Sequence, residues 1–235
     1  MRADADSRRG KPVNAQYNVA APDSLPARIA RHQRRKMFSA FMVFAAPEPQ
    51  DTILDLGVTS DRGYDHSNYF CAWYPRKTRI TALGLDDASF LSELYPGLAF
   101  VRTDGRDLPF ADLSFDYVHS SAVIEHVGSG EQQARFLREA WRVSRKGVFV
   151  TTPNRWFPVE FHTVMPLLHW LPPRHHRRLL ARIGQGFFAR EENLNLLSRN
   201  SLAQIAAAAG ITGAAIDTAA LLGWPTNLLL KARKR

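Results

Sequence analysis

Two kinds of hydrophobic pattern alternate along residues 51–152: short continuous apolar runs, and segments in which apolar residues recur at a regular spacing. Several apolar runs have the length of a buried strand and are too short for a buried helix. These predicted strands are residues 52–54, 80–85, 98–102, 114–118 and 147–151. Between some of them, apolar positions recur at helical spacing. Alternating strands and helices are typical of a parallel sheet with covering helices, so the pattern predicts an α/β fold.

The segments on either side follow other patterns. Residues 27–46 repeat apolar positions near helical spacing and predict a helix that ends before Pro47. After the fifth predicted strand, residues 155–193 break the alternation with aromatic rings and arginines, among them Arg155, and we expect a lid that shapes a pocket for an anionic, partly apolar substrate. A helix and two further strands are predicted at residues 201–210, 211–222 and 227–232.

These elements predict one domain preceded by a short arm. Residues 1–26 are polar, contain three prolines and lack sustained periodicity, so we expect a flexible N-terminal arm. Residues 27–235 form the predicted domain. Its expected parts are an N-terminal helix at 27–49, a binding core at 50–154, a lid or substrate insertion at 155–193, and a C-terminal helix with strands at 194–235.

The net charge of +9 is unevenly distributed over the 235 residues. Residues 1–50 carry 9 basic and 4 acidic side chains, residues 51–152 carry 11 and 14, and residues 153–235 carry 11 and 4. Basic flanks around a slightly acidic middle indicate an anionic partner, which can be an anionic or lipid-linked substrate, a membrane surface or, as a weaker candidate, nucleic acid. A solubilising surface charge is the alternative interpretation.

The location of the protein is constrained by what the sequence lacks. A single cysteine, Cys71, excludes an internal disulfide framework and a multi-cysteine metal site. We expect no signal peptide in the charged N-terminus and no membrane span, since no stretch approaches the roughly 18 apolar residues required. No His-x-x-x-His or Glu-x-x-His pair is present, so we predict no metal site. We expect a cytoplasmic protein that can also contact the inner face of the membrane.

Three carboxylates follow successive predicted strands, namely Asp55, Asp86 and Asp104. Because the carboxyl ends of parallel strands share one edge of a sheet, these side chains are expected to converge on one crevice. Carboxylates can accept hydrogen bonds from a ribose diol and from an exocyclic amine. Gly57, two residues after Asp55, allows the backbone to approach a ligand closely. Each aspartate taken singly can instead be a loop residue or a helix cap.

Five short runs give this pattern a more specific meaning. They are ILDLG at 53–57, TALGLD at 81–86, DGRDLPF at 104–110, SFDYV at 114–118 and VIEHV at 123–127. In this order they resemble the motifs of class I S-adenosylmethionine-dependent methyltransferases, with the type 11 small-molecule branch as the nearest group. The resemblance covers residues 50–155 closely. It implies a single Rossmann-like domain with a mostly parallel seven-stranded sheet, helices on both faces, and S-adenosyl-L-methionine as cofactor.

The resemblance also implies roles for individual residues. The implied contacts are Asp55 and Gly57 to the methionine part, Asp86 with Asp87 to the ribose hydroxyls, Asp104 and the Gly105 amide to the adenine, and Ser120, just past the fourth strand, near the sulfonium. Thr59 belongs to the turn that would face the cofactor. Thr59 and Asp61 stand where the family has further glycines, so their side chains must point away or the turn must be looser.

Methyl transfer from a sulfonium is an in-line displacement that depends mainly on positioning. An oxygen acceptor additionally needs a general base. Glu125 and His126, after the fourth strand, and His162, in the lid, are the candidate bases. His126 can instead pack or cap locally, and His162 can be a surface loop residue. We expect transfer to oxygen of a small-molecule, glycan or lipid-linked acceptor.

Other functions stay open at this point. An RNA methyltransferase is favoured by the positive charge, although no recognised RNA-binding module is present. A degenerate methyltransferase-like binding protein is suggested by the missing glycines of the turn. A dinucleotide-binding domain would need Gly-x-Gly-x-x-Gly after the first strand, and residues 57–62 supply one glycine.

Overall fold

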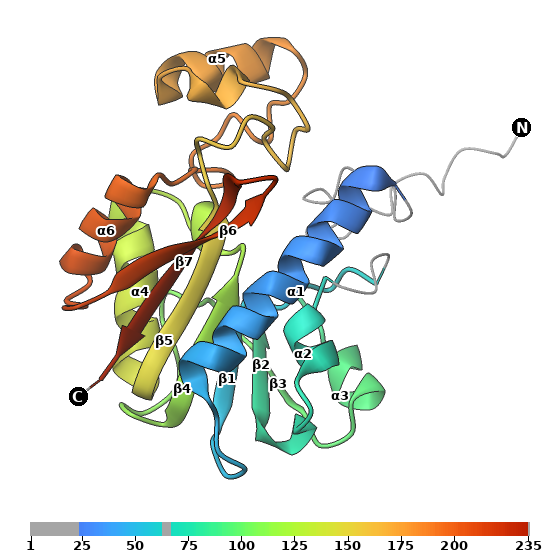
Figure 1. Cartoon of the computed structure of the whole chain (residues 1–235), viewed down its shortest axis with the longest axis vertical. Helices are drawn as coiled ribbons and strands as arrows, with labels where there is room; N and C mark the ends of the chain where they lie inside the picture. Colours follow the sequence, from blue (N-terminus) through green and yellow to red (C-terminus); the bar gives the residue numbers. More distant parts are fainter. Residues whose placement is uncertain (1–23, 63–66, 235) are drawn as a thin grey trace, which may run out of the picture.

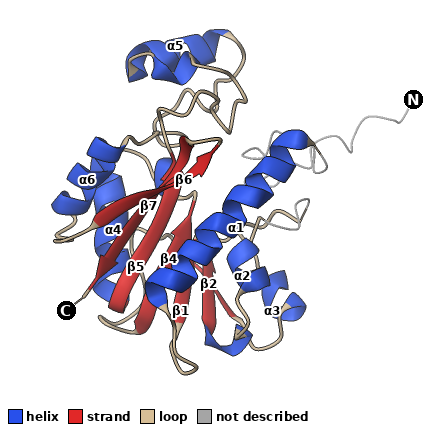
Figure 2. Ribbon diagram, in the orientation of Figure 1, coloured by secondary structure: helices blue, strands red, loops and turns tan. Residues whose placement is uncertain are grey.

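Seven strands form one sheet in the computed structural model, which describes residues 24–62 and 67–234 (Figures 1 and 2). The strands are β1 (Ile53–Leu56), β2 (Ile80–Gly84), β3 (Ala99–Arg102), β4 (Phe115–Ser121), β5 (Ser144–Pro153), β6 (Ala215–Leu221) and β7 (Trp224–Arg233). Their order in the sheet is β3-β2-β1-β4-β5-β7-β6. The first five are parallel, and β7 runs antiparallel between β5 and β6. The predicted mostly parallel, seven-stranded α/β fold is confirmed.

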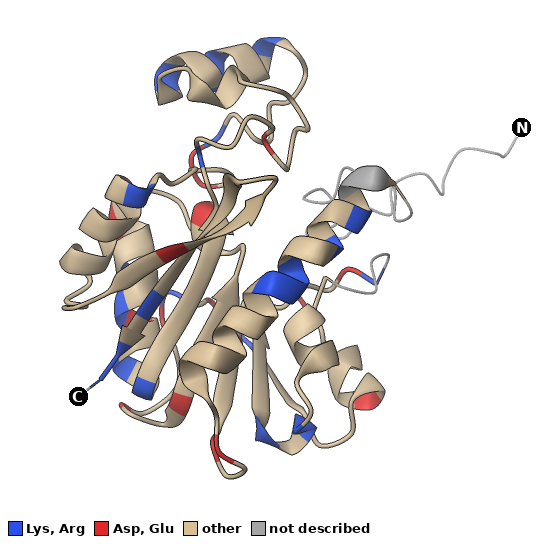
Figure 3. Ribbon diagram, in the orientation of Figure 1, with Lys and Arg blue, Asp and Glu red and all other residues tan. Residues whose placement is uncertain are grey.

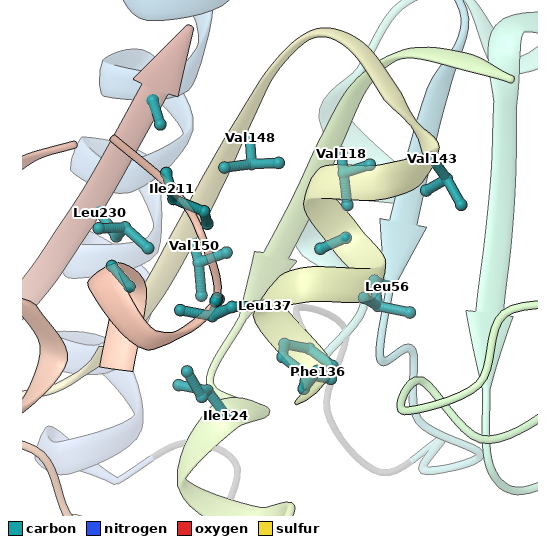
Figure 4. Packing of buried hydrophobic residues seen from close by; sticks show 14 of the residues in the cluster. Leu56, Val118, Ile124, Phe136, Leu137, Val143, Val148, Val150, Ile211 and Leu230 are labelled. Atoms are coloured by element: carbon teal, nitrogen blue, oxygen red, sulfur yellow. The ribbon is translucent and has the colours of Figure 1, made fainter. Parts of the chain in front are cut away.

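Helices cover both faces of this sheet. They are α1 (Leu25–Ala45), α2 (Tyr69–Trp73), α3 (Phe90–Leu94), α4 (Gly130–Val143), α5 (Pro173–Arg182) and α6 (Arg199–Ala208), with 3₁₀ turns η2 (Lys77–Arg79), η3 (Ile124–His126) and η4 (Leu168–Trp170). Side chains of α4 and α6 pack against one face, where Phe136 and Leu137 of α4 meet Leu56 and Val118 (Figure 4). Side chains of α1, α2 and α3 pack against the other face. No described helix is long and apolar enough to cross a membrane.

Strand β1 occupies the middle of the parallel region, and all four of its residues are buried. It pairs with β2 on one side and β4 on the other, so that Leu54 lies beside Thr81 and Val118. A strand that is buried on both faces is mostly apolar instead of alternating, and Asp55 is the polar exception in β1. This accounts for the short continuous apolar run from which the sequence predicts a core strand.

Helix α1 crosses one face of the sheet and buries a narrow apolar stripe. Ser24 caps its first turn by accepting a hydrogen bond from the Ala27 amide at 3.4 Å, and the helix ends at Ala46, whose φ of 42° is left-handed. Phe41 is completely buried. Its ring stands edge-on to four others, those of Phe70, Tyr117, His119 and Phe149. Phe41 therefore anchors the helix to the sheet, together with the buried Met37 and Ala45.

Some element boundaries differ from the sequence prediction. Strand β4 continues to Ser121 and β5 spans ten residues, because the two strands pair with each other along Tyr117–Ser121. Tyr69–Trp73 form helix α2, in which burial of Tyr69, Phe70 and Cys71 outweighs the weak helix propensity of these residues. The predicted arm at 1–26 lies almost entirely outside the described residues.

The segment that follows β5 rises beyond the carboxyl edge of the sheet and carries α5 (Figure 1). Leu180 and Phe188 of this segment form a small, separate apolar core with Leu194. Isolated bridges pair Asn154 with Leu197 and Val159 with Pro166. Residues 155–193 are called the lid segment below.

Truncating the anchor of α1 should be costly. We expect Phe41→Ala to lower the free energy of unfolding by about 3–5 kcal/mol, since a fully buried ring leaves a cavity. Val43→Ala, on the exposed side of the same helix, should change it by no more than about 0.5 kcal/mol. Val43 is 82% exposed. Urea denaturation followed by circular dichroism measures both, and equal effects would contradict the anchoring role.

Candidate functional site

The carboxyl edge of the sheet collects most of the polar side chains singled out in the sequence. A small cavity of about 20 Å³ opens at the ends of β1 and β4. Its lining residues are Asp55, Leu56, Gly57, Val58, Ser67, Asn68, Tyr69, Phe70, His119 and Ser121. It therefore combines residues of the first turn with α2 and with the end of β4.

Asp55 lies within β1 and takes part in a buried polar network. Its Oδ1 lies 2.7 Å from Nδ1 of His119, and its Oδ2 accepts a hydrogen bond from the Cys71 thiol at 3.2 Å. Nε2 of His119 is 3.2 Å from the Tyr69 hydroxyl. Burial, followed by the negative charge of Asp55, raises the pKa of Cys71 well above its usual value. Both carboxylate oxygens of Asp55 are thus committed to neighbouring side chains.

Gly57 forms the turn directly after β1 with a φ of +100°. Its amide donates to the Leu83 carbonyl at 2.7 Å, which ties the turn to β2. A Cβ at this position would lie 2.1 Å from Cγ2 of Val123. Only a residue without a side chain fits both the backbone angle and the space.

The following turn is closed by its own side chains. The Thr59 amide donates to Oδ1 of Asn68, and Nδ2 of Asn68 donates back to the Thr59 carbonyl, both at 2.9 Å. The Thr59 hydroxyl accepts a hydrogen bond from the Asp61 amide at 3.1 Å. Hydrogen bonds between these side chains and the backbone thus close the turn.

Asp86 and Asp87 differ sharply although they are neighbours. Oδ2 of Asp86 is buried and has no hydrogen-bond partner in the described part of the chain. Asp87 is exposed, and its Oδ1 accepts a hydrogen bond from the Ser89 amide at 3.0 Å, before α3. The structure therefore leaves Asp86 available for a ligand and uses Asp87 locally.

Asp104 follows β3 and is held by Arg106. The Arg106 side chain donates to both carboxylate oxygens, with distances from Nε of 3.0 and 3.1 Å. This hydrogen bonding lowers the pKa of Asp104. A Cβ on Gly105 would lie 2.9 Å from Cε2 of Phe136, so the chain passes closely over α4.

The expected position of Ser120 is wrong. It lies inside β4, where it is fully buried and its hydroxyl donates to the Leu56 carbonyl at 2.7 Å. Ser121, the last residue of β4, lines the cavity instead. The error arises because β4 is longer than its apolar run.

The three candidate bases lie together although 36 residues separate His126 from His162. Nε2 of His126 is 3.0 Å from Nε2 of His162, and Oε1 of Glu125 is 3.9 Å from Nε2 of His126. Nδ1 of His126 is 2.6 Å from the Asn193 carbonyl, and Nδ1 of His162 is 2.6 Å from Oε1 of Glu160. These three side chains, Glu125, His126 and His162, are called the His–Glu cluster below.

Burial dominates the electrostatics of the His–Glu cluster. Desolvation raises the pKa of Glu125 to about 7, and desolvation together with His162 lowers the pKa of His126 to about 3. Burial disfavours the charged form of His162, but the Glu160 carboxylate outweighs it and raises the pKa of that ring. Burial alone would raise the pKa of Glu160. The charge of His162 and local hydrogen bonds outweigh burial and lower this pKa to about 2.

A larger cavity of about 570 Å³ lies between the lid segment, α4 and α6. Arg155, Trp156 and Trp170 line it on the lid side. The Arg155 guanidinium donates to the Leu171 carbonyl at 2.8 Å and lies 5.5 Å from the centre of the Trp156 ring. Nε of Arg155 is buried, and no described residue accepts a hydrogen bond from it. Burial, followed by the charge of Arg177, lowers the pKa of Arg155.

Comparison with known proteins agrees with this architecture. The profile of the family described as "Methyltransferase domain" matches residues 63–151. No curated protein is similar enough in sequence to match the chain. Solved structures are similar in fold at low identity.

A protein from Pyrococcus horikoshii aligns with a TM-score of 0.58 and 14% identity over 95% of this chain and 97% of that one. The 1,6-didemethyltoxoflavin-N1-methyltransferase of Burkholderia thailandensis, solved with 1,6-didemethyltoxoflavin and S-adenosylhomocysteine, aligns with 0.57 and 14% over 92% and 93%. An S-adenosylmethionine-dependent methyltransferase from Mesorhizobium loti aligns with 0.55 and 16% over 83% and 98%. The match to residues 63–151 and the shared fold agree with the class I, type 11 S-adenosylmethionine-dependent methyltransferase that the sequence motifs indicate.

Several residues of the site are absent from the sequence prediction. His119 is a polar residue inside a buried strand, and that contrast is a signal that could have revealed it. Glu160 accepts hydrogen bonds from the amides of His162 and Thr163, a local carboxylate turn that the run at 160–163 could have suggested. Asn193 contributes a backbone carbonyl, for which the sequence holds no signal.

The turn after β1 should tolerate no side chain at Gly57. We expect Gly57→Ala to lower the free energy of unfolding by about 1–3 kcal/mol, because the backbone is left-handed and Val123 fills the space. Gly130→Ala is the matched control, since a Cβ on Gly130, at the start of α4, would have nothing within 4 Å. Chemical denaturation of both variants provides the measurement, and a neutral Gly57→Ala would disprove the constraint.

Proposed function

We propose that this methyltransferase transfers the methyl group to an anionic, partly apolar small molecule, which can be a glycan or lipid-linked compound. Oxygen is the proposed acceptor atom. The observation that carries the proposal is the buried Nε of Arg155, which lacks an acceptor among the described residues and borders a cavity of about 570 Å³. A second requirement is a cofactor site on the same sheet.

The residues at the carboxyl edge fit S-adenosylmethionine, which supplies an electrophilic methyl group on a sulfonium. The free Oδ2 of Asp86 would accept a hydrogen bond from a ribose hydroxyl. Gly57 would let the backbone pass the methionine part, and Gly105 would present its amide near the adenine. Asp55 would act through its network with His119 and Cys71, which fixes the floor of the small cavity.

Arg155 supports the anionic nature of the acceptor. An unpaired buried donor costs about 1–3 kcal/mol, and a carboxylate or phosphate that accepted its hydrogen bond would remove that cost. The flanking rings of Trp156 and Trp170 are 48% and 37% exposed, and their centroids are 6.3 Å apart. Exposed aromatic rings beside a guanidinium suit a ligand that has both an apolar part and a negative charge.

Contact with an anionic membrane remains part of the proposal for a lipid-linked acceptor. Basic side chains lie along α1 and on α5 (Figure 3). On α1, Arg28, Arg31, Arg35 and Lys36 are exposed. Such a surface would attract acidic lipid headgroups. RNA as the acceptor stays the alternative, since the same charges would attract phosphates.

Cofactor binding should depend on Asp86. We expect Asp86→Ala to weaken the binding of S-adenosylmethionine about ten- to a hundredfold, because a charged acceptor of hydrogen bonds is lost. Asp87→Ala removes the adjacent, exposed carboxylate and should have a much smaller effect. Isothermal titration calorimetry compares the two variants, and similar losses in both would contradict the assignment of Asp86.

Acceptor methylation should depend on Arg155 without any change in cofactor affinity. Extracts incubated with the protein and S-adenosylmethionine should contain a product about 14 daltons heavier than its precursor, detected by mass spectrometry. We expect Arg155→Gln to reduce its formation at least about tenfold, since a charge-assisted hydrogen bond is lost. Arg178→Gln, at an exposed position of α5, is the control. Normal product formation by Arg155→Gln would place the acceptor elsewhere.

A further inference from the structure

Two imidazole nitrogens face each other inside the protein. Nε2 of His126 and Nε2 of His162 are 3.0 Å apart, and the two rings are nearly perpendicular. His126 belongs to η3 at the end of β4, whereas His162 belongs to the lid segment. The contact thus joins a residue that follows β4 to a residue that follows β5.

The hydrogen-bond partners of the two Nδ1 atoms determine whether the Nε2 atoms of His126 and His162 carry a hydrogen. Nδ1 of His126 lies 2.6 Å from the Asn193 carbonyl, which can only accept, so Nδ1 carries the hydrogen. Nδ1 of His162 lies 2.6 Å from Oε1 of Glu160 and donates to it. In the neutral rings both Nε2 atoms therefore carry lone pairs. Two lone pairs at this distance repel each other, so the contact needs either a hydrogen on one Nε2 that it donates to the other, or a metal cation that both rings bind.

Glu125 supplies an independent observation. Its side chain is completely buried, and its Oε2 accepts a hydrogen bond from the Thr152 hydroxyl at 2.9 Å. Its Oε1 has no hydrogen-bond partner among the residues described and lies 3.9 Å from Nε2 of His126. A buried carboxylate oxygen without a partner is costly and calls for a ligand.

We propose that Glu125, His126 and His162 bind one divalent transition-metal ion, with zinc as the best match. Their three ligand atoms lie within 4.8 Å of one another. Tetrahedral zinc with bonds of 2.0–2.1 Å places its ligand atoms roughly 3.4 Å apart, so small side-chain shifts close the site. Two imidazoles and one carboxylate form a ligand set that zinc accepts, and three protein ligands leave a further position open.

The surroundings of the His–Glu cluster match those of bound metals. Each histidine donates its other ring nitrogen to a fixed acceptor, a carboxylate for His162 and a backbone carbonyl for His126, which is how metal-binding histidines are usually oriented. The Glu160 carboxylate is itself held by the amide and hydroxyl of Thr163, at 2.6 and 2.7 Å. His126 is partly exposed, which gives the ion a route from solvent.

A metal ion here would fasten the lid segment to the sheet. Glu125 and His126 follow β4, whereas His162 and the orienting Glu160 belong to the lid segment, as does Asn193 near its end. None of these residues lines the cavity at Arg155. The inference therefore assigns the His–Glu cluster a role different from the general base predicted from sequence, and it does not depend on the proposed acceptor.

Metal binding is tested on the full chain without an affinity tag. The protein is stripped with a chelator and titrated with Zn²⁺ by calorimetry and with Co²⁺ by visible absorption. We expect one ion per chain and Co²⁺ bands characteristic of a low-coordinate site with nitrogen ligands. Zinc should also protect the lid segment from limited proteolysis, because His162 would be tied to β4. Absence of saturable binding by the intact chain would overturn the proposal.

Substitutions identify the ligands. Glu125→Gln, which preserves size, and His162→Asn should each weaken Zn²⁺ binding at least about tenfold. His175→Ala removes an exposed histidine of α5 and should leave affinity and stoichiometry unchanged. Glu160→Gln, which loosens the orientation of His162, provides a further variant if the others fold poorly, with an expected loss of about 10–100-fold. Unchanged affinity in the folded ligand variants would refute the site.

Discussion

Burial of β1 on both faces is the constraint from which the arrangement of the molecule follows. Its four residues pack against α4 on one side and against α1 and α2 on the other, while β2 and β4 take its backbone hydrogen bonds. A strand in this position allows its chain to turn only at the two edges of the sheet. The loops that follow the carboxyl ends of the parallel strands therefore lie at the same edge of the sheet, and the ligand-binding residues gather there.

Unsatisfied polar atoms distinguish the parts of this edge from one another. Asp55 is buried but fully hydrogen-bonded, and therefore behaves as part of the scaffold. Asp86, Glu125 and Arg155 each have a buried polar atom for which the described residues provide no partner. Since each such atom costs about 1–3 kcal/mol, a ligand that pairs with it would remove that cost. Their different chemistry, two acceptors and one donor, points to different ligands.

Polar contacts join the lid segment to the edge of the sheet. Its apolar core is small and separate from the two clusters that cover the sheet. Its connections to the sheet edge include the contact of His162 with His126 and that of the Asn193 carbonyl with His126. A segment held in this way can respond to whatever binds at those groups, whereas the sheet beneath it is held by extensive burial.

The sequence by itself determined the fold class and the place of the site, because both depend on local patterns. Short apolar runs define β1 to β5, and the positions of Asp86 and Asp104, each two residues after a strand, already indicate a shared edge. Tertiary structure decided what each polar group does, because that depends on partners distant in the chain. Pairing with β5 extends β4 and places Ser120 inside it, and His119 takes one oxygen of Asp55. The meeting of His126 with His162 across 36 residues is likewise a result of folding, since no spacing in the sequence brings two separate segments to the same point.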